Sequence, residues 1–256
     1  ITNDDKPSKI LRQKKQASMR LAIQAVKEGR ADALVSAGNT GALMALSLLL
    51  LRTRAGIKRP AIASLVPTPK GPTAMLDMGA NVKCDAEHLV QFAQMGTAFY
   101  SAVTGNTDPS TGLLNIGSED GKGDDILNDA HMELRKQGGN YHGFIEGNDI
   151  AAGTVNVVVT DGFTGNVALK TLEGAAKSFN TFLKGAVKGS LLAMFGMLFA
   201  IPAMRKLKKQ LDPRLYNGAV LLGLNGTVVK SHGSADKVAF CQAILVASAM
   251  ASQKAC

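Results

Sequence analysis

The stretch NVVVTDGFTGNVALKTLEG, residues 156–174, decides the fold of this chain. Its first five residues are mostly valine, which is typical of a strand buried on both faces. An Asp-Gly pair and a second glycine follow, and a helical pattern then runs from about residue 165 to 185. The stretch therefore predicts a strand, a glycine-containing loop and a helix in succession.

The same succession recurs along the chain. Further strand-like runs lie at 31–37, 61–66, 74–78 and 112–116, and one or two more strands lie within 219–230. Helical stretches lie at about 7–28, 40–53, 86–103 and 124–137, and a last helix lies at 235–254. Strands that alternate with helices are joined in parallel, because each crossover returns the chain to the same edge of the sheet. The sequence therefore predicts an α/β protein with a mainly parallel sheet.

The composition is that of an ordinary globular protein. The 256 residues are 46% hydrophobic and 19% charged, enough for the core of one large domain or two small ones. The three cysteines, Cys84, Cys241 and Cys256, are widely spaced, which favours neither disulfides nor a metal site. Residues 1–15 are polar and charged, unlike a signal peptide. These features predict a cytoplasmic location.

The net charge of +9 predicts an acidic partner: nucleic acid, an anionic membrane, an acidic protein or a phosphorylated ligand. Proteins that bind nucleic acid usually interleave aromatic residues with basic ones or carry a known module. Aromatic residues make up only 5% of this chain, and no such module is evident. Nucleic acid is therefore not an expected partner.

One segment departs from the α/β pattern. Residues 189–204, GSLLAMFGMLFAIPAM, are almost entirely apolar and have basic flanks. They are interrupted by Gly196 and Pro202, and they fall short of the roughly 20 residues that span a bilayer. We expect residues 179–211 to protrude as a helical hairpin that docks on a membrane or an acidic carrier protein. A helix pair at a dimer interface is the alternative. The contact residues would be Leu192, Phe195, Leu198, Phe199, Arg205, Lys206, Lys208 and Lys209.

Glycine-bearing loops with polar residues follow four of the strands. They are SAGNTG (36–41), DMGAN (77–81), NIGSEDGKG (115–123) and TDGFTGN (160–166). In a parallel sheet all strand carboxyl ends lie at one edge, so the four loops would converge on one crevice. Glycine allows backbone amides to approach a ligand, and helix N-termini favour anions. The sequence thus predicts a site for phosphate or another anion. The alternative is that each loop is a tight turn whose Asn or Asp caps a helix.

Several other kinds of site are not indicated. No GxxxxGK[ST] or GxGxxG motif suggests a nucleotide, and no GxSxG, HExxH or paired Cys/His spacing suggests a triad or a metal. We therefore expect neither cofactor nor metal. His88, His131 and His142 are expected to be surface or hydrogen-bonded residues, whereas His232 lies at a strand-to-helix junction and could line the site.

Six blocks of sequence carry a family resemblance. They are SAGNTGALMA (36–45), LDMGANVKCD (76–85), HLVQFAQMG (88–96), LLNIGSEDGKG (113–123), VTDGFTGNVALKTLEG (159–174) and VKSHGSAD (229–236). In this order they resemble the signature blocks of the bacterial acyl-acyl-carrier-protein:phosphate acyltransferases. The resemblance spans about residues 5 to 250.

The resemblance implies a three-layer α/β/α fold similar to those of isocitrate and isopropylmalate dehydrogenases, and a homodimer. It implies transfer of a fatty acyl group from acyl carrier protein to inorganic phosphate, giving acyl-phosphate for phospholipid synthesis at the membrane. Residues 1–256 would form one acyltransferase domain that lacks an N-terminal part with an Asp-Ala-Met-Gly-Gly-Asp block.

The chemistry needs placement more than acid or base strength. Phosphate is already partly dianionic at neutral pH, and a thiol leaves readily with a pKa near 8.5. Lys122, between two glycines, is our candidate for holding phosphate or the developing oxyanion, with Asp161 and Asn166 orienting the substrate. The remaining candidate substrate-binding residues are Asn39, Thr40, Asp77, Asn81, Glu119, Gly162, Lys170 and His232. Asp77 and Asp161 could equally be helix caps.

Three other functions remain open. A phosphotransacetylase acting on coenzyme A thioesters is close in chemistry. A nicotinamide-dependent decarboxylating dehydrogenase would need an arginine cluster and metal-binding aspartates, which the loops do not clearly offer. A non-catalytic adaptor would bind the membrane or acyl carrier protein without turnover.

Overall fold

The computed structural model describes residues 16–189, 196, 199–205 and 212–252. Its elements in chain order are α2 (Ser18–Lys27), β1 (Ala33–Ser36), α3 (Thr40–Leu51), β2 (Ala61–Thr68), β3 (Gly71–Leu76), α4 (Ala86–Thr104), β4 (Thr111–Leu114), α5 (Asp125–Gln137), β5 (Tyr141–Ile145), α6 (Gly147–Ala152), β6 (Val157–Val159), α7 (Gly162–Lys188), the 3-10 helix η1 (Pro213–Tyr216), β7 (Ala219–Leu222), β8 (Thr227–Lys230) and α9 (Lys237–Ser252). Within this part of the chain, every helix is too short or too polar to cross a bilayer.

The eight strands form one sheet in the order β1-β8-β7-β2-β3-β6-β4-β5. Pairing is parallel between β1 and β8 and among β3, β6, β4 and β5. It is antiparallel where β7 meets β8 and β2, and where β2 meets β3. The sheet is therefore mostly parallel, with a reversal at its centre.

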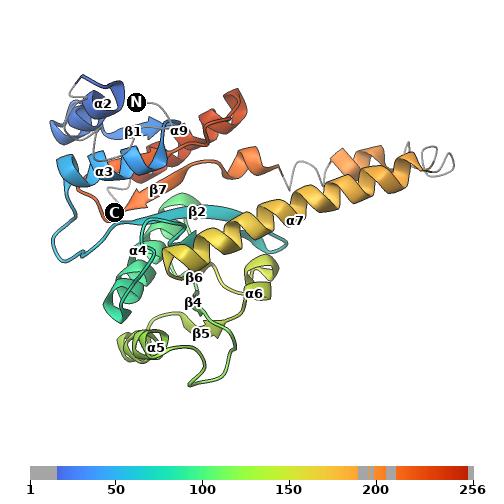
Figure 1. Ribbon diagram of the computed structural model, residues 1–256, viewed down its shortest axis with the longest axis horizontal. Helices are drawn as coiled ribbons and strands as arrows, with labels where there is room; N and C mark the ends of the chain where they lie inside the picture. Colours follow the sequence, from blue (N-terminus) through green and yellow to red (C-terminus); the bar gives the residue numbers. More distant parts are fainter. Residues whose placement is uncertain (1–15, 190–195, 197–198, 206–211, 253–256) are drawn as a thin grey trace.

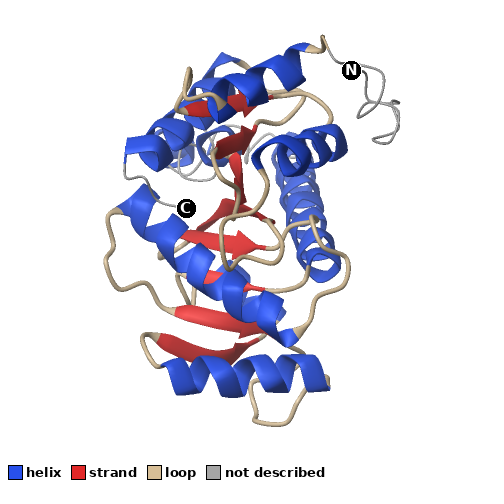
Figure 2. Cartoon of the chain, turned by 90° about the vertical axis from the view of Figure 1, so that its left-hand side faces the viewer, coloured by secondary structure: helices blue, strands red, loops and turns tan. Residues whose placement is uncertain are grey.

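Helices cover both faces of the sheet (Figure 2). On one face α4, α5 and α9 pack over a buried cluster that includes Phe92, Phe99 and Leu113. On the other face α2, α3 and α6 pack with the first turns of α7 over a cluster that includes Leu43 and Met75. Strands buried on both faces read as continuous apolar runs, which explains why the sequence predicts them well. The three-layer α/β/α architecture is confirmed.

The sequence prediction misses two elements and one antiparallel pairing. The runs at 61–66 and 74–78 are predicted as strands of a mainly parallel sheet, but β2 and β3 form an antiparallel hairpin through a short turn after Thr68. Residues 138–153 carry no strong pattern and contain the edge strand β5 and the short helix α6. Edge strands and one-and-a-half-turn helices bury little surface, so their apolar periodicity is weak.

Helix α7 leaves the sheet as a long arm (Figure 1). Its first turns pack the partly buried Ala168, Leu169 and Leu172 against the core, whereas Phe179 and Phe182 further along are exposed. Residues 199–205 are helical, with Phe199 and Arg205 exposed. Of the expected contact residues, these lie outside the described ones: Leu192, Phe195, Leu198, Lys206, Lys208 and Lys209.

The reversal of strand direction at the centre of the sheet places the carboxyl ends of the strands at two opposite edges. The carboxyl ends of β3, β6, β4 and β5 lie at one edge, which we call the first edge. Because β2 runs antiparallel to β3 and β7, the amino end of β2 also lies there. The carboxyl ends of β1 and β8 lie at the opposite edge. The predicted convergence of four loops at one edge is therefore wrong, because it assumes that all strands run the same way.

Candidate active site

Asp77, directly after β3, organises the loop at the first edge. Its Oδ1 accepts hydrogen bonds from the amides of Ile62 (3.0 Å), Gly79 (3.2 Å) and Ala80 (3.0 Å). Its Oδ2 accepts from the backbone and side-chain nitrogens of Asn81, at 2.7 and 2.8 Å. The carboxylate is fully buried and its acceptor capacity is used within the protein. The geometry makes Asp77 a support for this loop.

Asn81 joins this loop to its neighbours. Its side-chain amide also donates to the carbonyl of Pro60 (2.7 Å), and its own carbonyl accepts from the amide of Gly162 (2.8 Å). A β-carbon on Gly162 would lie 2.7 Å from the Asn81 carbonyl oxygen, and one on Gly165 would overlap the carbonyl of Asp77. The close packing of α7 on this loop therefore requires glycine at both positions.

Asp161 is the N-cap of α7. Its Oδ1 accepts from the amides of Phe163 (2.8 Å) and Thr164 (2.9 Å), and its Oδ2 accepts from the Thr164 hydroxyl (2.6 Å). With Gly162 bound to Asn81 and Gly165 bound to the Asp161 carbonyl, the first four amides of α7 have partners. The hydrogen bonds of Asp161 are those of a helix cap.

Asn166, one turn further along α7, is differently placed. Its side chain is exposed and makes no hydrogen bond to the described residues. It lies beside Gly79, whose added β-carbon would be 3.8 Å from the Asn166 Cγ. Gly79 has a φ of +123°, which favours glycine. Asn166 is therefore available to a ligand over the 77–81 loop.

A third loop leaves the first edge after β4, held by the buried Asn115. The Asn115 side chain donates to the carbonyl of Lys122 (3.0 Å) and accepts from the amide of Ile116 (2.8 Å). β4 pairs with β6 so that Leu113 lies opposite Val159, and the two following loops thus leave the sheet side by side. Asn115 is not among the residues predicted for the site, although its place directly after a buried strand is a signal in the sequence.

Lys122 and Glu119 are presented by this loop. Both side chains are exposed and make no ion pair with the described part of the chain. The amide of Lys122 donates to the carbonyl of Glu119 at 3.2 Å, which closes a turn. The ammonium and the carboxylate are thus free to meet solvent or substrate at the first edge.

Lys170 is on α7 but has a local partner. Its ammonium pairs with Glu173 at 2.9 Å, on the exposed side of the helix. The structure does not bring it into contact with the loops of the first edge. The predicted site role of Lys170 is supported only by its position on the same face of α7 as Asn166.

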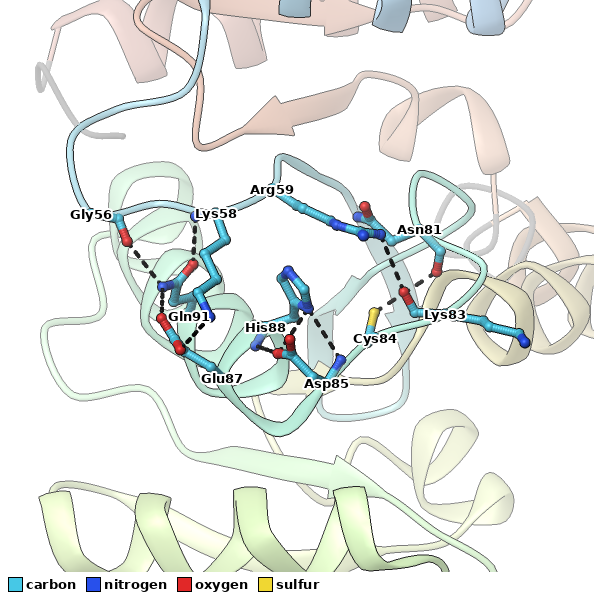
Figure 3. A network of polar contacts seen from close by, with 10 residues as sticks. All are labelled: Gly56, Lys58, Arg59, Asn81, Lys83, Cys84, Asp85, Glu87, His88 and Gln91. Atoms are coloured by element: carbon cyan, nitrogen blue, oxygen red, sulfur yellow. Dashed lines mark hydrogen bonds and ion pairs between the residues drawn. The ribbon is translucent and has the colours of Figure 1, made fainter.

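Basic residues that are not among the predicted site residues border the first edge (Figure 3). Arg59, just before β2, donates to the carbonyl of Lys83 at 3.4 Å. Lys58 pairs with Glu87 at 2.5 Å, and its amide donates to Gln91 (2.9 Å). The signal in the sequence was the basic run RTRAGIKR, residues 52–59, in the connection to β2.

Cys84 lies among these groups as a protonated thiol. Burial, together with the negative charges of Asp77 and Asp161, raises its pKa to about 12. Its Sγ lies 3.9 Å from the carbonyl of Asn81. The thiolate is the nucleophilic form, so Cys84 is a poor nucleophile at neutral pH.

Asn39, Thr40 and His232 lie at the opposite edge. Asn39 caps α3 by accepting from the amide of Ala42 (2.8 Å), and Thr40 is the first, exposed residue of that helix. The amide of His232 donates to Asn217 (3.0 Å), and its Nδ1 lies 2.8 Å from the Ser234 hydroxyl. The three predicted residues follow the carboxyl ends of β1 and β8, at the opposite edge of the sheet from Asp77, Asp161 and Lys122.

Two further features bear on ligands. A cavity of about 540 Å³ lies between β1 and α9 and is lined by none of the predicted site residues. In the part of the chain that the structure describes, no group of three or more His, Cys, Asp or Glu side chains is arranged to hold a metal.

Comparison with known proteins identifies the family. The family model described as "Fatty acid synthesis protein" matches residues 1–256. This chain belongs to that family. It is 54% identical over 254 residues to the phosphate acyltransferase of Paramagnetospirillum magneticum, covering 96% of this chain and 71% of the relative. It is 56% identical over 250 residues to that of Rhodospirillum centenum, covering 97% and 70%.

Solved structures of other proteins share the fold of this chain at low sequence identity. A phosphotransacetylase from Streptococcus pyogenes matches with a TM-score of 0.62 and 19% identity, covering 91% of this chain and 67% of the other. A 4-hydroxythreonine-4-phosphate dehydrogenase from Klebsiella pneumoniae matches with a TM-score of 0.53 and 14% identity, covering 91% and 68%. At such identities the matches establish the architecture alone.

Proposed function

We propose that this chain transfers a fatty acyl group from acyl carrier protein to inorganic phosphate, giving acyl-phosphate for phospholipid synthesis. The observation that carries the proposal is the identity of 54–56% with two curated phosphate acyltransferases over 96–97% of this chain. A shared reaction is the expected consequence of such identity when the glycine-bearing loops are intact.

The first edge offers groups that suit both the phosphate and the fatty acyl chain of acyl-phosphate. Lys122 offers an ammonium and Asn166, beside Gly79, offers an amide, and neither has another partner among the described residues. Exposed apolar side chains border the same loops: Ile116 is 81% exposed and Phe163 is 63% exposed. Cationic and polar groups next to exposed apolar ones match phosphate next to a fatty acyl chain.

The reaction balances without a covalent enzyme intermediate. A phosphate oxygen attacks the thioester carbonyl carbon, the C–O bond forms, and the C–S bond breaks as the thiolate leaves and takes up a proton from solvent. Lys122 would hold phosphate and Asn166 would donate to the developing oxyanion. Placement of the reactants can supply about 7 kcal/mol or more, and an oxyanion donor about 3 kcal/mol. The protonated Cys84 is consistent with direct attack by phosphate.

Other predicted residues would act by positioning the loops and the helix that carry Lys122 and Asn166. Asp77, Asn81, Asp161 and Gly162 would position the loops, in keeping with their internal hydrogen bonds. Glu119 would remain a substrate contact beside Lys122. Asn39, Thr40, Lys170 and His232 are not part of the proposed phosphate site.

The arm suits a surface role. α7 and residues 199–205 would form the predicted helical hairpin, which docks on the cytoplasmic face of the membrane where acyl-phosphate is used. Phe182 is 75% exposed and Phe199 is 89% exposed, which supports burial against lipid. The exposed apolar side chains of α7 also suit the expected homodimer. We also propose that the fold is similar to those of isocitrate and isopropylmalate dehydrogenases.

The reaction can be tested directly. Purified protein is incubated with phosphate and a series of acyl-acyl-carrier-protein and acyl-coenzyme A donors, and products are followed by mass spectrometry. We expect acyl-phosphate and free carrier thiol in equal amounts, with acyl carrier protein the better donor. Absence of acyl-phosphate with every donor contradicts the proposal, and preference for coenzyme A identifies a phosphotransacetylase.

A further inference from the structure

The loop that joins α3 to β2 concentrates positive charge. Residues 52–59, RTRAGIKR, contain four basic residues and no acidic one, and all four basic side chains are exposed. Lys58 is neutralised by Glu87. The side chains of Arg52 and Arg54 make no ion pair or hydrogen bond to the described residues. The loop therefore presents uncompensated charge.

Lys83 extends this surface. It follows Asn81 in the neighbouring loop, is exposed, and its carbonyl accepts from Arg59 (Figure 3). The nearest acids along the chain are engaged: Asp85 caps α4 with His88, and Glu87 holds Lys58. We call Arg52, Arg54, Arg59 and Lys83 the basic edge.

The backbone under the basic edge is fixed. The side chain of Asn225 donates to the carbonyls of Leu51 (3.1 Å) and Thr53 (2.9 Å), and the amide of Arg54 donates to Gly223 (3.0 Å). Gln91 donates to the carbonyl of Gly56 at 2.9 Å. The arginines are thus carried on a pre-ordered platform, which lowers the entropy lost on binding.

The basic edge adjoins the proposed site. Lys83 is two residues from Asn81, whose carbonyl binds the first amide of α7 at Gly162. Arg59 bridges from the start of β2 to this same loop. A partner seated on the basic edge would lie next to the loop that carries Gly79 and the first turns of α7, which carry Asn166.

We propose that the basic edge docks an acidic protein, the carrier that delivers the acyl thioester. This inference rests on the proposed function and adds where the donor binds. Charge complementarity favours a protein surface over a single anion, because the cations are spread over two loops rather than gathered around one pocket. Such surfaces act mainly on encounter rate and specificity, and they weaken with salt.

The test uses the full chain and the double variant Arg52→Glu/Arg54→Glu. Binding of holo-acyl carrier protein is measured by calorimetry at low and physiological salt. We expect the Kd to rise at least tenfold in the variant, and its salt dependence to flatten. Turnover of a neutral acyl-N-acetylcysteamine thioester and the KM for phosphate are expected to stay within twofold of the parent.

A matched control separates position from net charge. Lys136→Glu/Lys237→Glu makes the same charge change at exposed sites on α5 and α9. We expect it to bind carrier protein like the parent. Equal loss of binding by both variants, or no loss in either, overturns the docking site. Loss of binding to anionic vesicles with carrier binding unchanged also overturns it, in favour of a membrane contact.

The experiments distinguish failure of the docking proposal from failure of the proposed acyl transfer. Acyl-phosphate formation with an unchanged Kd and KM for the carrier in Arg52→Glu/Arg54→Glu rejects the docking site and leaves the function standing. Position-specific loss of carrier binding in a chain that makes no acyl-phosphate rejects the function and supports docking. Unfolding midpoints of both variants are compared with the parent, so that a binding defect is read only from folded protein.

Discussion

The amide nitrogen of Gly162 donates to the carbonyl oxygen of Asn81 across 2.8 Å, and this bond ties the loop after β3 to the first residue of α7. The Asp77 carboxylate holds the same loop through four hydrogen bonds and joins it to β2 through a fifth, which the amide of Ile62 donates. The position of Asn166 over Gly79 depends on this contact. The candidate site is therefore set by backbone packing between two loops.

Gly165→Ala is expected to lower the free energy of unfolding by about 1–3 kcal/mol, because its β-carbon would overlap the carbonyl of Asp77. Urea unfolding measures the change. Gly174→Ala is the matched control: it is in the same helix, exposed and free of neighbours, and it should raise the free energy of unfolding by about 0.5–1 kcal/mol. Similar effects at both positions would contradict the packing described for Gly165.

Asp77→Asn is expected to lower the free energy of unfolding by about 2–3 kcal/mol, since one oxygen that accepts from backbone amides becomes a donor facing donors. Activity should fall together with stability. Asp129→Asn changes an exposed aspartate on α5 and provides the control. A stable Asp77→Asn protein that has lost only phosphate binding would instead make Asp77 a substrate ligand.

Lys122→Ala is expected to raise the KM for phosphate about ten- to hundredfold, the loss of one charge-assisted hydrogen bond. The unfolding midpoint should not change, because the side chain is exposed and unpaired within the described chain. Steady-state kinetics with varied phosphate measure the effect, and Lys136→Ala is the control. An unchanged KM removes Lys122 from the phosphate site.

The stability of the folded chain is expected to fall as the pH drops from 7 toward 5. Burial lowers the pKa of His131, which stacks on Phe144 and lies between Asp120 and Arg135. A histidine whose folded pKa lies below the unfolded value of about 6.5 contributes stability above that pH and loses it as the pH falls. Unfolding in urea across this range measures the slope. His131→Gln should flatten it, and parallel curves would exclude His131 as a source.

Phe182→Glu is expected to reduce flotation of the protein with anionic vesicles at least fivefold, because a carboxylate replaces an exposed aromatic ring on the arm. Turnover of a soluble donor should be unaffected. Phe240→Glu, on α9, is the control. Equal flotation of Phe182→Glu and the parent would exclude the arm as the membrane contact and leave the dimer interface as its role.

The local elements follow from the sequence because their causes are local. The valines before Asp161 and the apolar run before Gly38 predict strands through composition alone, and glycine or Asp after each strand marks where a helix begins. The buried strand β6 is therefore confirmed, whereas the sequence left two roles open for Asp161 and only its hydrogen bonds in the structure show the cap.

What the sequence could not decide is which way each strand runs. The chain determined its α/β class and its polar loops, because apolar periodicity and turn residues act over a few neighbours. Only the tertiary structure decided that the hairpin of β2 and β3 reverses the sheet, which sends Asn39 and His232 to one edge and Asp77 and Lys122 to the other. Strand direction depends on pairing between residues far apart in the sequence, and so does the approach of Arg59 to Lys83.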